Sequence, residues 1–241
     1  MRWIHKHGEP HSIQQFREAN EPLGVNLDYR SGFTRKQELR AELMQEQCFL
    51  CGYTGTPLDA ARLGGYDQDA PGGPVFAPHN EHIKSQKLCR VELGAKVGTV
   101  LGEDMDYRNI IAALEVKNSP NTNQDERFGA VVRQLDIIPL PPTLPECETE
   151  YAYFPVGTIR GNSERARDTI ADLQLNHRTL KDWRLNTVRR FLPLRHETPV
   201  PELQQIIHAM QTPMDGKLPE FAFVILQLAR DYLAMHQAAG A

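Results

Sequence analysis

The run His79-Asn80-Glu81-His82, followed 27 positions later by Asn109, constrains this chain more than any other feature. A carboxylate directly before a histidine suits phosphodiester hydrolysis, because the carboxylate can hold a divalent metal while the imidazole takes a proton from water. We predict that His82 is the general base and Glu81 a metal ligand, with His79 as the candidate second ligand. Asn109 is predicted to orient the His82 ring through an amide hydrogen bond that fixes its tautomer. All these side chains are expected to converge on one cation.

Each residue also has an ordinary structural interpretation. A Glu-His dipeptide is common in proteins, and alone it is seldom functional. Asn109 equally fits a helix cap. His79 equally fits a surface residue after Pro78. The prediction therefore depends on the whole set and its spacing.

Two cysteines, Cys48 and Cys51, precede the central run. The order Cys-x-x-Cys, then Glu-His, then Tyr-x-Asn is the order of an HNH nuclease, a ββα fold with one metal. A structural zinc usually has four Cys or His ligands, and no second Cys-x-x-Cys follows Asn109. The two thiols are thus either part of a zinc site or buried groups that pack as small apolar side chains.

Composition indicates an ordinary globular core, with 40% hydrophobic and 24% charged residues among 241. No apolar run approaches the roughly 20 residues that span a bilayer, so we expect a cytoplasmic protein that does not enter a membrane. The sequence has no glycine-rich phosphate loop, so ATP hydrolysis is not expected of this chain.

Net charge is the main objection to a nuclease. The value is −4, with a pI near 6.1, whereas free-standing nucleic-acid binders are normally basic. Either the cations are concentrated on one face of the protein, or a partner protein provides the affinity for nucleic acid. Residues 163–196 contain eight cationic and four acidic residues. Lys181 and Arg184 are three positions apart, so they would share one side of a helix. With Lys84 and Arg108 they are the candidate nucleic-acid contacts; a solvated amphipathic helix is the equal alternative.

Periodicity and turn residues predict an α-rich α+β protein in three parts. An N-terminal arm covers residues 1–34, a central part covers 35–135, and a helical part covers 136–241. The order of the motifs, rather than the periodicity, makes 35–135 the expected small ββα-metal nuclease core and leaves 136–241 as the part expected to dock a partner. Thr34 and Ser163 are the predicted N-caps of two helices. Helices are expected over 35–47, 163–174, 178–194, 201–210 and 219–237, with a short strand at 75–76 and a hairpin over 151–159.

Several further motifs accompany the central run. They are Met1-Arg2-Trp3-Ile4, Leu50-Cys51-Gly52-Tyr53-Thr54-Gly55, Glu81-His82-Ile83-Lys84-Ser85-Gln86, Asp106-Tyr107-Arg108-Asn109, Phe128-Gly129-Ala130 and Asp168-Thr169-Ile170. With these motifs the chain resembles, over most of residues 1–195, the HNH nuclease subunit of Septu-type and retron-linked anti-phage systems, the PtuB-like proteins.

The resemblance implies a nuclease that uses Mg²⁺ or Mn²⁺, cuts DNA or tRNA, and works with a PtuA-like ABC-type ATPase. In retron-linked forms the partners extend to a reverse transcriptase with its RNA–DNA product. Where the family usually supplies a third His or Asn ligand, this chain has no ligand in residues 127–133, so either Asn123 or Asp125 would substitute or the metal would be held loosely.

Two alternatives to a nuclease stay open, and the missing third ligand favours the first of them. One is a catalytically degenerate scaffold that binds the ATPase without cutting. The other is a zinc-stabilised module that binds nucleic acid without hydrolysis.

Overall fold

The computed structural model describes residues 1–23, 28–30, 32–63, 75–93, 102–117 and 127–239. Within them the protein is α+β and rich in helix, with two small antiparallel sheets of two strands each. One continuous core runs from Met1 to Tyr232. No helix in this part of the chain is long and apolar enough to cross a membrane.

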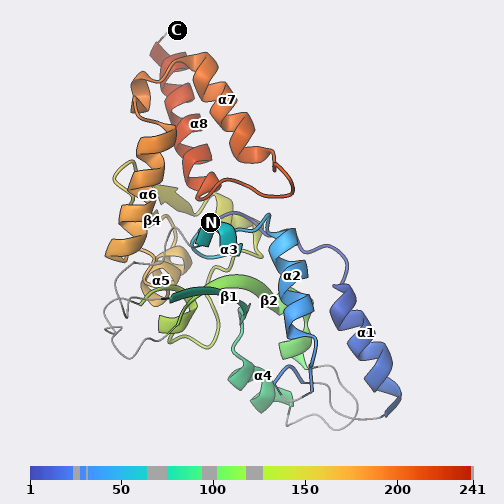
Figure 1. Ribbon diagram of the computed structural model, residues 1–241. Helices are drawn as coiled ribbons and strands as arrows, with labels where there is room; N and C mark the ends of the chain where they lie inside the picture. The colour runs from blue at the N-terminus through green and yellow to red at the C-terminus, as the bar shows by residue number, and fades with distance from the viewer. Residues whose placement is uncertain (24–27, 31, 64–74, 94–101, 118–126, 240–241) are drawn as a thin grey trace.

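The centre of the molecule is a pair of antiparallel strands, β1 (Val75–His82) and β2 (Ile110–Lys117), seen in the middle of Figure 1. Five consecutive residues of β2, from Ile110 to Leu114, are at most 3% exposed. Because side chains alternate between the faces of a strand, this run shows that both faces of β2 are covered. The predicted strand at 75–76 corresponds to the first two residues of β1, which continues to His82.

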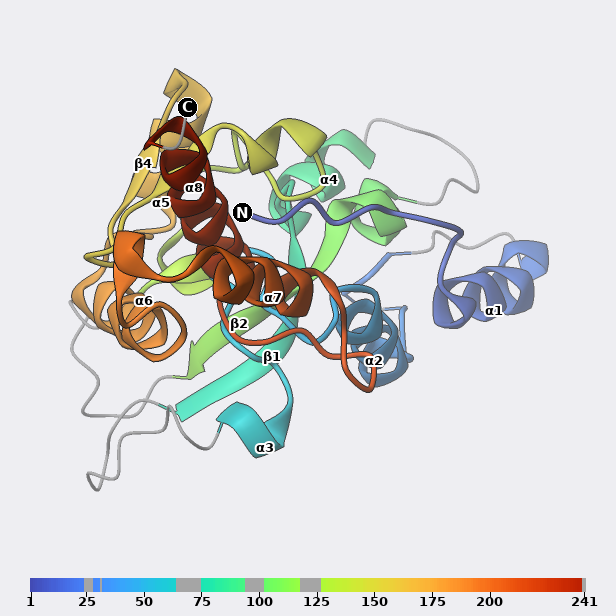
Figure 2. The same cartoon turned by 90° about the horizontal axis from the view of Figure 1, so that it is seen from above.

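Helices of the N-terminal half surround this pair. They are α1 (His11–Asn20), α2 (Lys36–Glu46), α3 (Ala60–Leu63) and α4 (Gln86–Leu93). Figure 2 shows α2 and α3 beside β1, and both pack against it. Short 3-10 helices cover Glu21–Leu23, Glu103–Met105, Tyr107–Asn109, Gly129–Val132, Pro145–Glu148 and Arg195–Glu197.

Residues 1–34 do not form the extended arm that was predicted. They contain α1, whose Ile13 and Phe16 are three positions apart and therefore share the buried face. The terminal amine of Met1 donates to the Tyr153 hydroxyl at 2.7 Å, which ties the start of the chain to its C-terminal half. Thr34 is also not a cap, because α2 begins after Arg35 and no side chain caps it.

The C-terminal half follows the predicted elements closely. Its sheet consists of β3 (Tyr151–Tyr153) and β4 (Ile159–Gly161), and its helices are α5 (Glu164–Asp172), α6 (Arg178–Phe191), α7 (Val200–Gln211) and α8 (Ala222–Ala239). Ser163 caps α5, as predicted, by accepting the Ala166 N–H at 3.3 Å. The α7–α8 pair forms the end of the molecule that carries the C-terminus (Figure 1).

Two glycines provide a test of this packing. Gly157, in the β3–β4 turn, and Gly216, after α7, both have φ between 75° and 82°. A Cβ at Gly157 would lie 2.1 Å from the Lys181 carbonyl oxygen, whereas a Cβ at Gly216 would meet open space. Gly216→Ala is expected to lower the free energy of unfolding by about 1–2 kcal/mol. Gly157→Ala should cost at least about 3 kcal/mol, because a clash adds to the same backbone strain.

Urea denaturation of both variants makes the comparison. Equal losses would show that β4 and α6 do not pack around this turn as described.

Candidate functional site

The pairing of β1 with β2 determines where the central run points. Glu81 lies opposite Ile111, and His82 lies opposite Ile110. Since neighbouring residues of a strand face opposite sides, Glu81 shares one face with His79, while His82 shares the other with Asn80. The predicted convergence of Glu81 and His82 is not found: in the structure their side chains lie in separate surroundings.

His82 occupies a buried site and is 3% exposed. Its Nε2 lies 2.9 Å from the Asp104 carbonyl oxygen, and its Nδ1 lies 3.3 Å from the side-chain nitrogen of Gln86. A carbonyl oxygen can only accept, so Nε2 carries the proton and Nδ1 keeps its lone pair. Burial lowers the pKa of His82 to about 4, although the bond to Asp104 opposes this shift. The ring is therefore neutral and held in one tautomer.

Glu81 lies on the other face of β1 and has two charged neighbours. One carboxylate oxygen accepts from Arg133 Nη1 at 2.8 Å, and the other lies 3.2 Å from His79 Nε2. The exposed fraction of the Glu81 side chain is 15%, and that of Arg133 is 8%. The His79 Nδ1 is buried without a hydrogen-bond partner among the described residues. This face thus combines a carboxylate, an imidazole and a guanidinium.

The hydrogen bonds of the Asn109 side chain in the described part of the chain go to groups other than the His82 ring, contrary to the prediction. Its amide oxygen accepts the Lys84 N–H at 2.7 Å, and its amide nitrogen donates to the carbonyl oxygens of Lys84 and Glu103 at 3.2 and 3.0 Å. It therefore joins the chain after β1 to the chain before β2. Because Asp104 follows Glu103, this connection also fixes the carbonyl that orients His82.

Two of the predicted nucleic-acid contacts are engaged within the protein. Lys84 pairs with Glu92 at 2.5 Å and also contacts Glu103. Arg184 is 1% exposed and donates to the Gly157 and Leu175 carbonyl oxygens at 3.0 and 2.7 Å. Arg184 is thus a buried structural residue, and its prediction as a phosphate contact is wrong for this structure.

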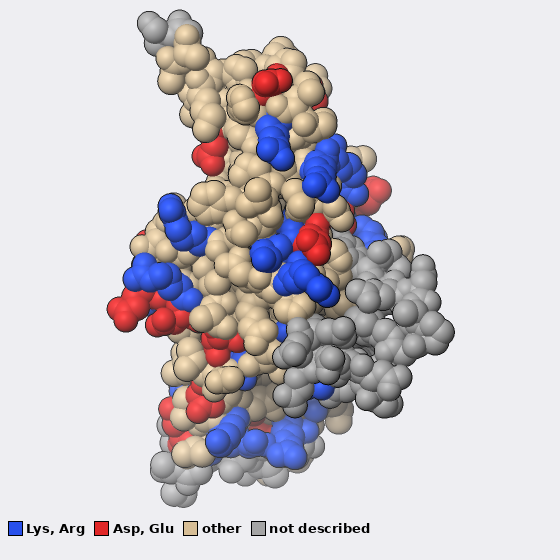
Figure 3. Space-filling view, turned by 90° about the vertical axis from the view of Figure 1, so that its left-hand side faces the viewer, with Lys and Arg blue, Asp and Glu red and all other residues tan. Residues whose placement is uncertain are grey.

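The other two contacts remain predictions. Arg108 is exposed, and Lys181, on α6, is half-buried. Figure 3 shows the side of the molecule covered by α5 and α6: Lys and Arg lie in small separate groups among acidic and uncharged residues. The visible part of this face carries no continuous basic stripe.

The cysteine pair lies near the same strands. Cys51 is 2% exposed, and its sulfur accepts the Leu114 N–H at 3.2 Å, while Cys48 is half-buried. In the described ranges no group of three or more His, Cys, Asp or Glu side chains is placed to hold a metal. The third-ligand candidates Asn123 and Asp125 lie outside those ranges. Both the zinc and the third ligand stay predictions.

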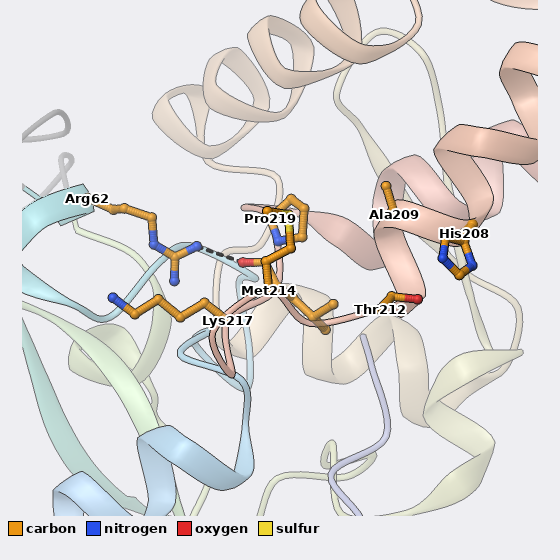
Figure 4. A pocket seen from close by; sticks show the side chains of 8 residues that line it. Arg62, His208, Ala209, Thr212, Met214, Lys217 and Pro219 are labelled. Atoms are coloured by element: carbon orange, nitrogen blue, oxygen red, sulfur yellow. Dashed lines mark hydrogen bonds between the residues drawn. The ribbon is translucent and has the colours of Figure 1, made fainter.

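A separate hollow of about 420 Å³ lies where α7 ends (Figure 4). Ala209, Leu218 and Pro219 form its apolar walls, and Met214 beside it is 80% exposed. Arg62 on its edge donates to the Leu218 carbonyl oxygen at 2.6 Å. None of the residues predicted for catalysis or metal binding lines this hollow.

Sequence reasoning missed three residues that surround the central run. Arg133 pairs with Glu81, Gln86 covers His82 Nδ1, and the Asp104 backbone holds His82 Nε2. Gln86 carried a weak signal, because it stands four positions after His82. Arg133 and the Asp104 carbonyl carried no sequence signal, because both are distant from the central run in the chain.

No protein-family model matches the chain, and no curated protein matches it. The interpretation of the site therefore depends on the geometry described above.

The burial of His82 predicts a pH dependence of stability. The unfolded chain takes up a proton at this ring near pH 6.5, whereas the folded protein does so near pH 4. The unfolded state thus binds more protons between these values, and stability falls as the pH falls. We expect a loss of up to about 3 kcal/mol in the free energy of unfolding.

Urea titrations at a series of pH values measure this loss. His82→Gln keeps a donor for the Asp104 carbonyl and cannot titrate, so its stability should fall less between pH 6.5 and 4. Parallel curves for the two proteins would contradict the assignment.

Asn109 should matter through position rather than contact. Asn109→Ala removes the hydrogen bonds of this side chain to Lys84, Cys89 and Glu103 at a partly buried site and is expected to cost about 2 kcal/mol. It should also speed the hydrogen exchange of the His82 Nε2–H, measured by NMR, because Asp104 is no longer held in place. Unchanged exchange would reduce Asn109 to a stabilising role only.

Proposed function

We propose that this protein is a metal-dependent nuclease of the HNH type that hydrolyses phosphodiester bonds in nucleic acid. The observation that carries the proposal is the state of His82. A neutral imidazole with one nitrogen bonded to a backbone carbonyl and the other keeping its lone pair has the protonation state and the tautomer of a general base. Buried structural histidines also bond to carbonyls, so the proposal draws further support from the groups beside it.

The residues on the other face of β1 fit two ligands of a divalent metal. His79 Nε2 and a Glu81 carboxylate oxygen lie 3.2 Å apart, and metal ligands of these types bind at about 2.0–2.2 Å. Two such donors can therefore share one cation without a change of backbone. When bound, the metal would neutralise charge on the phosphoryl oxygens and assist the departing oxygen.

Residues of this chain would remove the proton from the attacking water. His82 would remove a proton from water through Nδ1 once the side chain of Gln86 moves aside. Asn109 would keep the Asp104 carbonyl in position while His82 carries the extra proton. The His82 ring lies on the opposite face of β1 from Glu81. Catalysis would therefore require a movement at the end of β1 that brings His82 and the metal bound by Glu81 to the same phosphate.

The partner belongs to the same proposal. A net charge of −4 gives the chain little attraction for a polyanion. An ABC-type ATPase, with a reverse transcriptase and its RNA–DNA product in retron-linked systems, would supply the grip and the activating signal. Binding to such a partner is also a means of driving the movement at β1.

A cleavage assay tests the proposal. The chain is incubated alone, and together with an ABC-type ATPase encoded beside it, with plasmid DNA and with tRNA in Mg²⁺ or Mn²⁺. His82→Ala should lower the cleavage rate by about a hundredfold to ten-thousandfold. His236→Ala is the matched control, because His236 Nε2 also bonds to a backbone carbonyl, at 3.0 Å, but in α8. Equal rates for wild type and His82→Ala would remove the nuclease assignment.

One observation favours a second candidate, a degenerate scaffold that binds the ATPase without cutting. Glu81 is paired with Arg133, and no third His, Cys, Asp or Glu joins His79 and Glu81 among the described residues. If the protein is a scaffold, the wild type and Glu81→Gln should bind the ATPase equally tightly, and neither should release cleavage products. The two candidates are separated by metal-dependent cleavage that the wild type shows and Glu81→Gln lacks.

A further inference from the structure

Arg133 is held by more contacts than a simple ion pair needs. Nη1 donates to Glu81 at 2.8 Å and also to the His82 carbonyl oxygen, Nε to the Leu135 carbonyl oxygen at 2.7 Å, and Nη2 to that of Asp136 at 2.6 Å. The guanidinium thus links the end of β1 to the segment 133–138. It places a fixed positive charge on one of the two predicted metal ligands.

A guanidinium and a divalent cation compete for the same carboxylate. The Arg133 side chain is 8% exposed, so its charge acts on Glu81 with little screening by water. A metal that binds Glu81 beside Arg133 would meet this charge at close range. Binding therefore favours a state in which the guanidinium has left.

The structure contains an acceptor for the displaced guanidinium. Asp172, the last residue of α5, accepts the N–H groups of Gln134 and Leu135 with one oxygen, at 2.8 and 3.0 Å. Its other oxygen is buried without a hydrogen-bond partner among the described residues. An unpaired buried carboxylate oxygen is costly, so it attracts a cation from nearby.

Asp172 belongs to the same neighbourhood as the ion pair. Burial raises the pKa of the Tyr53 hydroxyl well above its ordinary value. The charges of Glu81, Arg133 and Asp172 also act on this hydroxyl. Asp172 is bonded to the two residues that directly follow Arg133, which keeps it beside the arginine.

The Arg133 side chain can leave Glu81 while the segment 133–138 stays in place. The Asp136 carbonyl oxygen accepts the Ser85 N–H at 2.6 Å, and the Ile138 N–H donates to the Ile83 carbonyl oxygen at 3.1 Å. Neither of these bonds involves the guanidinium.

We infer that Arg133 is an internal competitor for the metal: the cation binds His79 and Glu81 only after the guanidinium leaves Glu81 and pairs with the open oxygen of Asp172. The inference rests on the metal site proposed above and adds its regulation. It defines a resting state, seen here, in which Arg133 neutralises Glu81.

The test is the affinity for Mn²⁺, measured by electron paramagnetic resonance on the purified full chain. Arg133→Gln keeps an amide that can bond to backbone carbonyls but removes the charge, and it should bind Mn²⁺ about tenfold more tightly than wild type. Arg62→Gln is the matched control, because Arg62 bonds to Asp59 and to the Leu218 and Phe49 carbonyl oxygens in the same manner elsewhere. It should leave the affinity unchanged.

Asp172→Asn tests the acceptor. The variant keeps the oxygen that accepts two N–H groups but removes the charge, and Mn²⁺ affinity should fall about threefold. In the Arg133→Gln background the same change should have no effect, because no guanidinium remains to be received.

The outcomes separate this inference from the proposed function. Equal, measurable Mn²⁺ affinities for wild type and Arg133→Gln would overturn the competition and leave the metal site intact. Absence of binding in both would overturn both.

A measurement on the wild type keeps the test decisive if Arg133→Gln fails to fold. The arginine Nε–H NMR signals are followed during a Mg²⁺ titration, and Arg133 is assigned with Arg133→Lys. The Arg133 signal should shift as Mg²⁺ binds, and an Arg133 signal that stays constant while Mg²⁺ binds would overturn the inference.

Discussion

The antiparallel register of β1 and β2 is the constraint on which the candidate site depends. It places Glu81 opposite Ile111 and His82 opposite Ile110, and the alternation of a strand then sends the two side chains to opposite faces. The buried face makes His82 a neutral, oriented ring, while the other face gives Glu81 its partners His79 and Arg133. A shift of the register by one residue would exchange these surroundings.

The site also needs its connecting segments held together. Asn109 bonds to Lys84, two residues after β1, and to Glu103, so one amide closes the link between the two strands. The segment 133–138 crosses the same place, with the Ser85 N–H donating to the Asp136 carbonyl oxygen at 2.6 Å. Asn109 and this crossing segment therefore hold the end of β1, and with it His82, in a defined position.

Sequence reasoning was most successful where one local cause suffices. Ser163 caps α5 because its hydroxyl and the Ala166 N–H are close in the chain, and the amphipathic periods of α5 to α8 give their bounds within a few residues. It failed where an interaction joins distant segments or where burial overrides a charge. Arg184 was assigned to a helix surface, yet it faces the core because it satisfies the Gly157 and Leu175 carbonyls. Neither the Glu81–Arg133 pair nor the bond from His82 to Asp104 leaves a pattern in the sequence.

The charges of this chain argue for dependence on a partner. Lys84 is taken up by Glu92 and Glu103, Arg133 by Glu81, and Arg184 by the core. Cations that satisfy internal acceptors cannot also neutralise phosphates, and affinity for nucleic acid depends on how many phosphates are neutralised. Lys84, Arg133 and Arg184 therefore serve the protein's own fold, which supports the proposal that another subunit delivers the substrate. Under the competition inferred above, Arg133 neutralises Glu81 until a divalent cation displaces the guanidinium.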